Sequence, residues 1–184
     1  MRVVLAVTGA SGVILGQRLC EVLLQSGHEV HLIVSRGAEK VGSAEGAPGF
    51  EHLKTAVRAC YGDLDFDSPL ASSSFRFDCM AICPCSMKTL SAVANGFADT
   101  LVARAAESCL KLGRPLALVV RETPLSLPAL ENMVAVKRAG AFVVPPVLGF
   151  YSKPRRVEDL IDFVVGKVLD CLRIDHKLYR RWGE

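Results

Sequence analysis

The chain has 184 residues, which is the length of one ordinary domain. Its residues are 51% hydrophobic and only 7% aromatic, a balance typical of an aliphatic α/β core. The net charge of +3 is too small to indicate nucleic-acid binding, and no stretch reaches the roughly 18 consecutive apolar residues that a membrane helix needs. We therefore expect one domain over residues 1–184, with neither nucleic acid nor membrane among its partners.

The N-terminus and the cysteines indicate a cytoplasmic protein. One basic residue precedes the first apolar run, without the basic region, apolar segment and cleavage site of a signal peptide. The seven cysteines are an odd number scattered along the chain, which argues against a disulfide framework. Cys83 and Cys85 flank a proline, but no second Cys/His pair at zinc spacing accompanies them, so we predict no metal site.

The first 76 residues begin with a strand, a helix and a second strand. In order, we expect these at 2–8, about 12–26 and 29–34. Gly27 stands where a left-handed residue would end the helix. Residues 36–76 are less periodic, and we expect only a short helix near 51–61 there, before a Ser/Asp-rich loop.

The remaining residues alternate strand and helix more regularly. We expect a strand at 77–83, helices at 86–95 and 99–112, a strand at 115–120, a helix at 126–139, a strand at 141–144 and a helix at 157–172. Asp99 is placed to cap its helix, and a tail of about residues 173–184 follows. The alternation predicts an α/β fold of the Rossmann-like, doubly wound type, with a mostly parallel sheet and helices on both faces.

Four of the predicted strands run directly into polar loops. These loops begin at Thr8, Ser35, Pro84 and Arg121. Because the carboxyl ends of parallel strands share one edge of a sheet, and open α/β sheets bind ligands at that edge, the four loops are candidates for one site.

The glycines of the first loop favour a phosphate monoester over a dinucleotide. Gly9, Gly12 and Gly16 do not have the G-x-G-x-x-G spacing, and the second strand ends in Ser35 instead of a ribose-binding acid. Helix starts at Ser11 and at Ser86–Thr89 offer free N–H groups, and the second adds Lys88, as would suit the phosphate of FMN. The alternative is that Ser11 and Ser86 only cap their helices.

Charged residues add a second indication. Arg121 and Glu122 directly follow a buried strand, where unpaired charge is costly. Arg104 and Lys111 lie seven residues apart, on one helix face, although a solvated surface explains that spacing equally well. With Tyr151 and the lysines near the C-terminus, the set fits binding and cleavage of a phosphate or diphosphate.

Several motifs together resemble one family. The chain is similar to the UbiX/Pad-type flavin prenyltransferases over nearly its full length. The matching segments are Thr8-Gly9-Ala10-Ser11-Gly12, Pro84-Cys85-Ser86-Met87-Lys88-Thr89, Asn95-Gly96-Phe97-Ala98-Asp99, Arg121-Glu122-Thr123-Pro124-Leu125, and Pro145-Pro146 through Phe150-Tyr151.

The resemblance implies an activity and partners. Such proteins join a dimethylallyl group from dimethylallyl phosphate to N5 and C6 of reduced FMN, without a required metal. The prenylated FMN then passes to a UbiD-type decarboxylase. The resemblance also implies a homo-oligomer, expected to be a dodecamer.

The resemblance further implies roles for individual residues. FMN would be held by Gly9, Ala10, Ser11, Ser35, Ser86, Met87, Lys88, Thr89 and Arg121. The prenyl donor would be held by Tyr151, Lys167 and Trp182. The catalytic set would be Glu122, Ser11, Glu45, Lys111 and Arg104.

Breaking an allylic C–O bond leaves a cation and a phosphate, and this chemistry suits the implied residues. The cations stabilise the leaving anion, and aromatic faces such as Trp182 shield the allyl cation from water. Our hypothesis is that Glu122 is the acid/base, which protonates the leaving phosphate and helps to remove the proton at flavin C6.

Two other functions remain open from sequence. One is an FMN-dependent decarboxylase of the phosphopantothenoyl- or peptidyl-cysteine type, or one acting on an aromatic acid. The chain lacks the Pro-x-Met-Asn segment of the cysteine enzymes, and its histidines 28, 31, 52 and 176 are most simply surface or structural. The other is a flavin carrier without catalysis, which would need neither Glu122 nor the cluster of cations.

Overall fold

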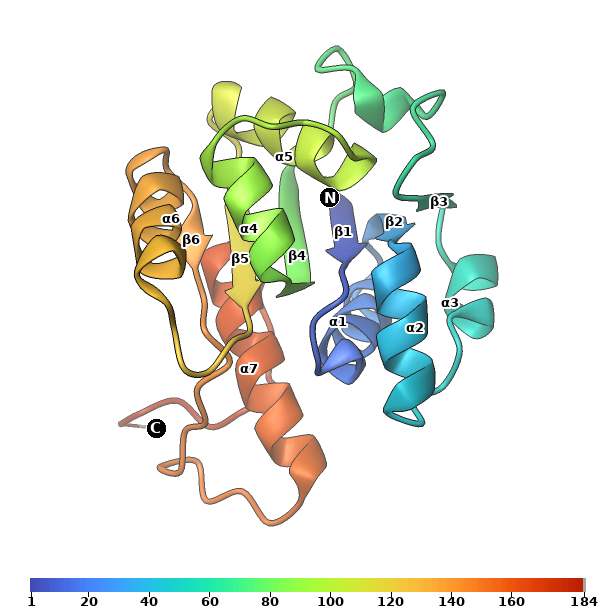
Figure 1. Ribbon diagram of the computed structural model, residues 1–184. Coiled ribbons are helices and arrows are strands. Elements are labelled where there is room, and N and C mark those ends of the chain that lie inside the picture. The colour runs from blue at the N-terminus through green and yellow to red at the C-terminus, as the bar shows by residue number, and fades with distance from the viewer. Residues whose placement is uncertain (184) are drawn as a thin grey trace.

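The computed structural model describes residues 1–183. Their six strands form one all-parallel sheet (Figure 1). Across the sheet the strand order is β3-β2-β1-β4-β5-β6. The strands are β1 (Arg2–Val7), β2 (Glu29–Val34), β3 (Ala59–Gly62), β4 (Cys79–Cys85), β5 (Leu116–Val120) and β6 (Phe142–Val143). The order reverses between β1 and β4, so the topological switch point lies between these two strands.

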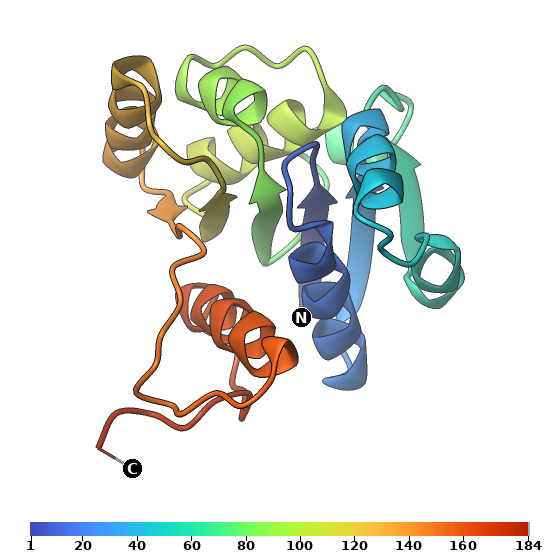
Figure 2. The same ribbon diagram turned by 60° about the horizontal axis from the view of Figure 1, so that its bottom comes forward.

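Helices cover both faces of the sheet (Figure 2). Helices α1 (Val13–Gln25), α3 (Glu51–Ala56) and α7 (Val157–Cys171) pack on one face. Helices α4 (Met87–Ala94), α5 (Leu101–Lys111) and α6 (Leu127–Arg138) pack on the other. Helix α2 (Arg36–Ala44) follows β2, and the 3-10 helix η1 (Pro69–Ala71) lies against α5.

The central strand β1 shows why both faces need covering. Val3, Leu5 and Val7 enter the core on the α1 and α7 side. Val4 and Ala6 enter the core on the α4 and α5 side. An apolar run whose alternate residues are all buried is typical of a parallel strand between two helical layers.

The predicted fold class is confirmed, and most predicted elements are present with shifted ends. The prediction for residues 36–76 was wrong in two ways. Arg36–Ala44 is a helix, and the short helix at 51 stops at Ala56 because the chain then forms the edge strand β3. The sheet is also parallel throughout the described chain, where a mostly parallel one was expected.

The capping predictions had mixed outcomes. Gly27 has a positive φ of 75° and follows Ser26, the C-cap of α1, as expected. Asp99 does not cap α5, because the N-cap is Thr100, whose hydroxyl accepts the N–H of Ala103 at 3.3 Å. Asp99 instead forms an ion pair with Lys88.

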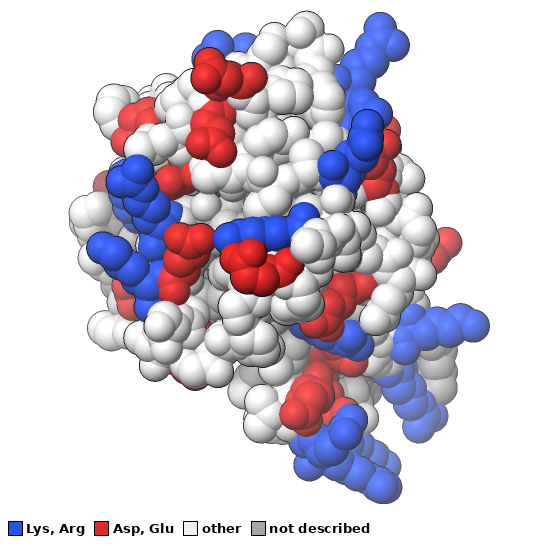
Figure 3. Space-filling view, turned by 90° about the vertical axis from the view of Figure 1, so that its right-hand side faces the viewer, with Lys and Arg blue, Asp and Glu red and all other residues white. Residues whose placement is uncertain are grey.

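The surface shows no dominant charge in the view over α2 and α3 (Figure 3). Lys and Arg side chains are interspersed there with Asp and Glu. Within residues 1–183, no helix is long and apolar enough to cross a bilayer.

Candidate functional site

The carboxyl edge of the sheet holds a small polar cavity at the switch point. It has a volume of about 190 Å³ and is built by the loops after β1, β2, β3 and β4, together with α4 and the start of α5. Its lining consists of Thr8, Gly9, Ser35, Gly37, Asp63, Ser86, Lys88, Thr89, Ala92, Asp99, Thr100 and Val102. Three of the four polar loops that the sequence assigned to one site therefore meet in this cavity.

Thr8 ties the first and third of these loops to each other. Its buried hydroxyl donates to the carbonyl of Pro84 at 2.8 Å and accepts the N–H of Ser86 at 2.9 Å. Both hydrogen bonds cross the switch point between β1 and β4. Thr8 thereby fixes the start of α4 relative to β1.

The N-terminus of α4 faces the cavity. Ser86 is the N-cap, and its hydroxyl lies 3.3 Å from the N–H of Thr89 and 3.0 Å from the hydroxyl of Thr89. The Lys88 ammonium lies 3.5 Å from Asp99 and is mostly exposed. A helix start with two hydroxyls and a cation is a favourable site for a phosphate monoester.

The first two loops approach each other too closely for side chains. A Cβ on Gly9 would lie 2.9 Å from the Cα of Gly37, at the beginning of α2. In the same loop, Ser35 is buried and caps α2 through the N–H of Ala38 at 3.0 Å. The backbones of Gly9 and Gly37 are thus in close contact, and Ser35 is held in place beside them.

The N-terminus of α1 differs from that of α4 because a carboxylate already occupies it. Glu45 accepts the N–H groups of Gly12 at 2.8 Å and Val13 at 3.2 Å. Burial alone would raise the pKa of Glu45, but hydrogen bonds from Ser11, Gly12 and Val13 and the charge of Arg121 hold it below its ordinary value. Of the two helix starts that the sequence suggested for a phosphate, the geometry favours only α4.

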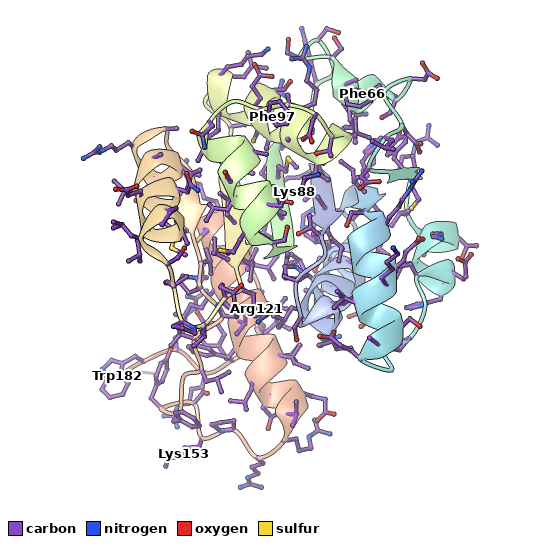
Figure 4. All side chains as sticks on the ribbon, in the orientation of Figure 1. Phe66, Lys88, Phe97, Arg121, Lys153 and Trp182 are labelled. Carbon is purple, nitrogen blue, oxygen red and sulfur yellow. The ribbon has the colours of Figure 1, made fainter. Side chains whose placement is uncertain are left out.

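Arg121 and Glu122 follow β5 at the same edge. The buried Nε of Arg121 has no hydrogen-bond partner within residues 1–183, so it remains available to an acceptor. Glu122 is exposed, and its carboxylate accepts the N–H of Thr123 at 3.0 Å. In Figure 4, Arg121 lies below Lys88, on the side of the tail that carries Trp182.

Tyr151, Lys167 and Trp182 form a second cluster, apart from the cavity. The ring of Tyr151 meets that of Trp182 edge-on, with centroids 5.4 Å apart. The Lys167 ammonium lies 4.7 Å from the ring centre of Tyr179. Hydrogen bonding to Tyr179 and then the nearby Tyr151 hydroxyl raise the pKa of Lys167, which therefore stays charged. A hollow of about 420 Å³ adjoins this cluster, between Tyr151 and the tail.

The structure does not bring Arg104 and Lys111 to the cavity of their own chain. Arg104 donates to the carbonyl of Ala71 at 3.1 Å and to Glu107 at 2.8 Å. Lys111 is the last residue of α5. It lies about 15 Å along the helix from the N-terminal end, which lines the cavity. Both residues therefore remain predictions that one copy of the chain does not support.

Sequence reasoning missed several residues of the two clusters. Thr8 was visible within the first motif, but only its bonds to the β4 loop show its role. Asp63 lies in the stretch without usable pattern, yet its carbonyl accepts the N–H of Leu101 at 2.9 Å, at the cavity. Tyr179 and Asp170 had no local signal, because their importance comes from contacts across the tail.

Comparison with known proteins identifies the family. The family described as Flavoprotein matches residues 1–169. The flavin prenyltransferase UbiX of Methanocaldococcus jannaschii is 46% identical over 183 residues, which cover 100% of this chain and 99% of that protein. The chain belongs to the UbiX family of flavoproteins.

Solved structures of UbiX proteins have the same fold. AnUbiX (PadA1), in complex with FMN and dimethylallyl pyrophosphate, superposes with a TM-score of 0.96 at 42% identity and covers 100% of this chain and 97% of its own. A dodecameric FMN-dependent UbiX-like decarboxylase from Escherichia coli O157:H7 gives 0.95 at 39% identity, with both chains fully covered.

A more distant structure shares the fold alone. The FMN-dependent cysteine decarboxylase TvaF has a TM-score of 0.67 and 16% identity, over 94% of this chain and 98% of its own. A likeness at this level of identity concerns the arrangement of strands and helices, and it assigns no activity to the chain.

Proposed function

We propose that this chain is a flavin prenyltransferase, which joins a dimethylallyl group from dimethylallyl phosphate to N5 and C6 of reduced FMN. The observation that carries the proposal is that the fold presents two separate anion-binding groups. One is the α4 start in the cavity, and the other is Lys167 with its tyrosines near the tail. A prenyl transfer to FMN has two phosphates to bind, whereas FMN binding alone has one.

The cavity fits the flavin phosphate. Ser86, Lys88 and Thr89 would hold it at the N-terminus of α4, with Met87 in the same turn. Gly9, Ala10 and Ser35 would line the approach, where a larger residue than Gly9 has no room. The unpaired Nε of Arg121 would donate to an acceptor of the flavin. The reduced flavin supplies the nucleophilic atoms N5 and C6.

The second cluster fits the prenyl phosphate. Lys167 and Tyr151 would bind the phosphate by charge and hydrogen bonding. Trp182 packs edge-on against Tyr151, so an aromatic face is available to the allyl group beside the phosphate. This arrangement stabilises both the leaving anion and the developing cation.

Glu122 is the proposed acid/base of the reaction. When the allylic C–O bond breaks, its electron pair leaves with the phosphate, and the Glu122 carboxyl protonates that oxygen. The resulting carboxylate would accept the proton that N5 loses when N5 bonds to C1 of the allyl group. Glu122 would then give a proton to C2 of the remaining prenyl double bond as C6 bonds to C3, and it would accept the proton that C6 loses, which restores the acid. The exposed carboxylate follows Arg121 directly, at the carboxyl edge of the sheet. Ser11 and Glu45, joined by a hydrogen bond, complete the proposed set.

The relatives also support an assembly and a recipient. The E. coli UbiX-like protein is a dodecamer, and we propose a homo-dodecamer here. Arg104 and Lys111, which do not reach their own cavity, would then act at the site of a neighbouring copy. The product would pass to a UbiD-type decarboxylase, in the cytoplasm, where the seven free thiols are stable.

The positions of the histidines do not support the decarboxylase alternative. His176 is bound to Asp170 at 3.1 Å, and His31 lies 3.0 Å from Glu29 within β2. His28 directly precedes β2, His52 lies on α3, and no histidine of the described chain lines the cavity. Residues 1–183 also contain no group of three or more His, Cys, Asp or Glu side chains arranged to hold a metal ion.

The test is to incubate the protein without oxygen with reduced FMN and dimethylallyl phosphate, and to weigh the extracted flavin. We expect a flavin heavier by one five-carbon prenyl unit. A parallel incubation with dimethylallyl diphosphate determines the donor. Unchanged FMN with both donors would refute the proposal, and release of CO₂ from an aromatic or cysteine-derived acid would favour the decarboxylase.

A further inference from the structure

The Asp170 carboxylate on α7 contacts three side chains of the C-terminal tail. Asp170 accepts the hydroxyl of Tyr179 at 2.5 Å, and its other oxygen lies 2.8 Å from the guanidinium of Arg181. The ring Nε2 of His176 lies 3.1 Å from that same oxygen. The tail beyond α7 has no helix or strand of its own in the described residues. These polar contacts hold it together with Ile174 and Leu178, which pack against the core.

The His176 ring is fixed in one orientation. Its Nδ1 accepts the N–H of Leu178 at 3.2 Å, so the ring proton lies on Nε2 and is donated to Asp170. The His176 side chain is only 2% exposed. Burial alone would raise the pKa of Asp170, but the hydrogen bonds from Arg181, Tyr179 and His176 keep it below its ordinary value. The carboxylate is therefore ionised at neutral pH.

Gly166 leaves room for the rings of Tyr179 and His176 to pack on α7. A Cβ on Gly166 would lie 2.5 Å from the ring of Tyr179 and 2.6 Å from the ring of His176. Gly166 stands one helical turn before Asp170 on α7. The tail rings thus lie directly on the α7 backbone, and any larger side chain would displace them.

The same tail residues touch the proposed donor site. Tyr179 lies under the Lys167 ammonium and packs on Phe163, at 5.0 Å between centroids. Tyr151 also packs on Phe163, at 5.7 Å, and meets Trp182. Asp170 therefore reaches Lys167 through Tyr179, and reaches Trp182 through its chain neighbour Arg181.

We propose that Asp170 is a positioning residue of the donor site. Its carboxylate docks the tail on α7, so that Tyr179 orients Lys167 and Trp182 covers Tyr151. Asp170 itself would not touch the prenyl donor. The inference rests on the proposed function, because it assigns the docked tail to binding of the prenyl phosphate.

The single tryptophan of the chain, Trp182, gives a direct readout of docking. The test compares Asp170→Asn with Asp175→Asn in the full-length, FMN-loaded protein. Asp175 is the matched control, because it is an exposed carboxylate of the same tail that does not take part in the network around Asp170. Trp182 is already 81% exposed in the docked tail, so the quantity to measure is its mobility. We expect a lower fluorescence anisotropy of Trp182 in Asp170→Asn than in the wild type, and the wild-type value in Asp175→Asn.

Steady-state kinetics then separates positioning from a general loss of structure. In Asp170→Asn we expect the KM for dimethylallyl phosphate to rise on the order of tenfold, as for a lost hydrogen bond to a charged group, with the Kd for FMN unchanged. Gly166→Ala, which displaces the rings without altering charge, should raise the same KM. It also keeps the test decisive should Asp170→Asn fail to fold.

Wild-type anisotropy of Trp182 and an unchanged KM for dimethylallyl phosphate in both variants would overturn the inference. A weaker FMN affinity together with a lower melting temperature in these variants would also overturn it, because that result indicates a purely structural role. A wild-type protein without transfer activity would refute the proposed function instead. The anisotropy comparison would still decide whether Asp170 docks the tail.

Discussion

Among the individual residues, the proposed acid/base Glu122 is held in place by little of the surrounding protein. Its side chain is exposed, and its hydrogen-bond partner is the N–H of the next residue, Thr123, at 3.0 Å. Its carboxylate lies outside both apolar cores of the described chain. Its replacement is therefore a clean test of chemistry, separate from folding.

Replacing Glu122 by Gln should leave FMN bound and slow the reaction. The amide keeps the shape but cannot transfer a proton, so we expect kcat to fall by about 10²- to 10⁴-fold with little change in the Kd for FMN. Flavin fluorescence titration and the rate of prenyl transfer measure the two quantities. Glu131→Gln, an exposed carboxylate on α6, is the control and should retain wild-type turnover. Wild-type turnover in Glu122→Gln would remove Glu122 from the mechanism.

At the scale of elements, two helix starts share one kind of cap and differ in what they face. Ser86 caps α4 at the cavity, and Ser126 caps α6 through the N–H of Ala129 at 3.4 Å, without lining the cavity. Removing either hydroxyl costs the same kind of capping hydrogen bond. Only the first removal should also affect a ligand.

Ser86→Ala and Ser126→Ala should each lower the free energy of unfolding by about 1 kcal/mol. Only Ser86→Ala should also weaken FMN binding, on the order of tenfold, because its hydroxyl and the α4 N–H groups face the cavity. Denaturant unfolding and FMN titration of both variants give the comparison. Equal FMN affinities in the two variants would place the phosphate elsewhere than α4.

The contact between α1 and the end of α2 predicts a pH dependence. Glu45 has a folded-state pKa below its ordinary value of 4.5, so its stabilising contribution is complete above pH 4.5 and is lost as the pH falls through the lowered pKa. We expect the wild type to melt at a higher temperature than Glu45→Gln at neutral pH. That gap should shrink as the pH falls below 4.5, and a gap that stays constant would show that the Glu45 charge does not stabilise α1.

The sequence predicts the elements best where apolar runs are unbroken. β1, β4 and β5 are buried throughout or nearly so, and their apolar runs identify them. Helix α2 lacks that signal because only Ala38 and Gly42 are buried in it. The edge strand β3 is half-exposed, so its four residues carry no strong pattern.

For the site, the loops could be predicted and the distances could not. The rule that parallel strands share a carboxyl edge is enough to group Ser35, Ser86 and Arg121, because each follows an apolar strand. Glu45 accepts the N–H of Gly12 at the start of α1 although the two residues are 33 positions apart, and no local pattern encodes such a contact. The same holds for Asp170, whose role comes from the path of the tail.

At the scale of the whole molecule, the positions of Arg104 and Lys111 require more than one copy if they act. Both belong to α5 and do not line the cavity of their own chain. In Figures 1 and 2 the tail lies at the bottom, well separated from α5. These two cations therefore connect the proposed chemistry to the proposed assembly.

Mixed assemblies test this connection. Lys111→Ala and Glu122→Gln should each be nearly inactive alone, and co-expressed mixtures should regain a measurable fraction of wild-type turnover, because one copy supplies Lys111 to the Glu122 of another. A mixture of Lys111→Ala with Arg104→Ala is the control and should stay inactive, since both changes affect the same contributing face. Absence of recovery in the first mixture would show that Lys111 does not act across copies.

In the proposed reaction, one chain keeps two phosphates apart, with FMN at the α4 start and the prenyl donor at Lys167. The most direct test is to measure the FMN Kd and the dimethylallyl phosphate KM in the Lys167→Met variant. Loss of a charged hydrogen-bond donor should raise the donor KM about ten- to hundredfold. The FMN Kd should stay at the wild-type value. A parallel rise in both constants would contradict this separation, because it would mean that the two phosphates share one site.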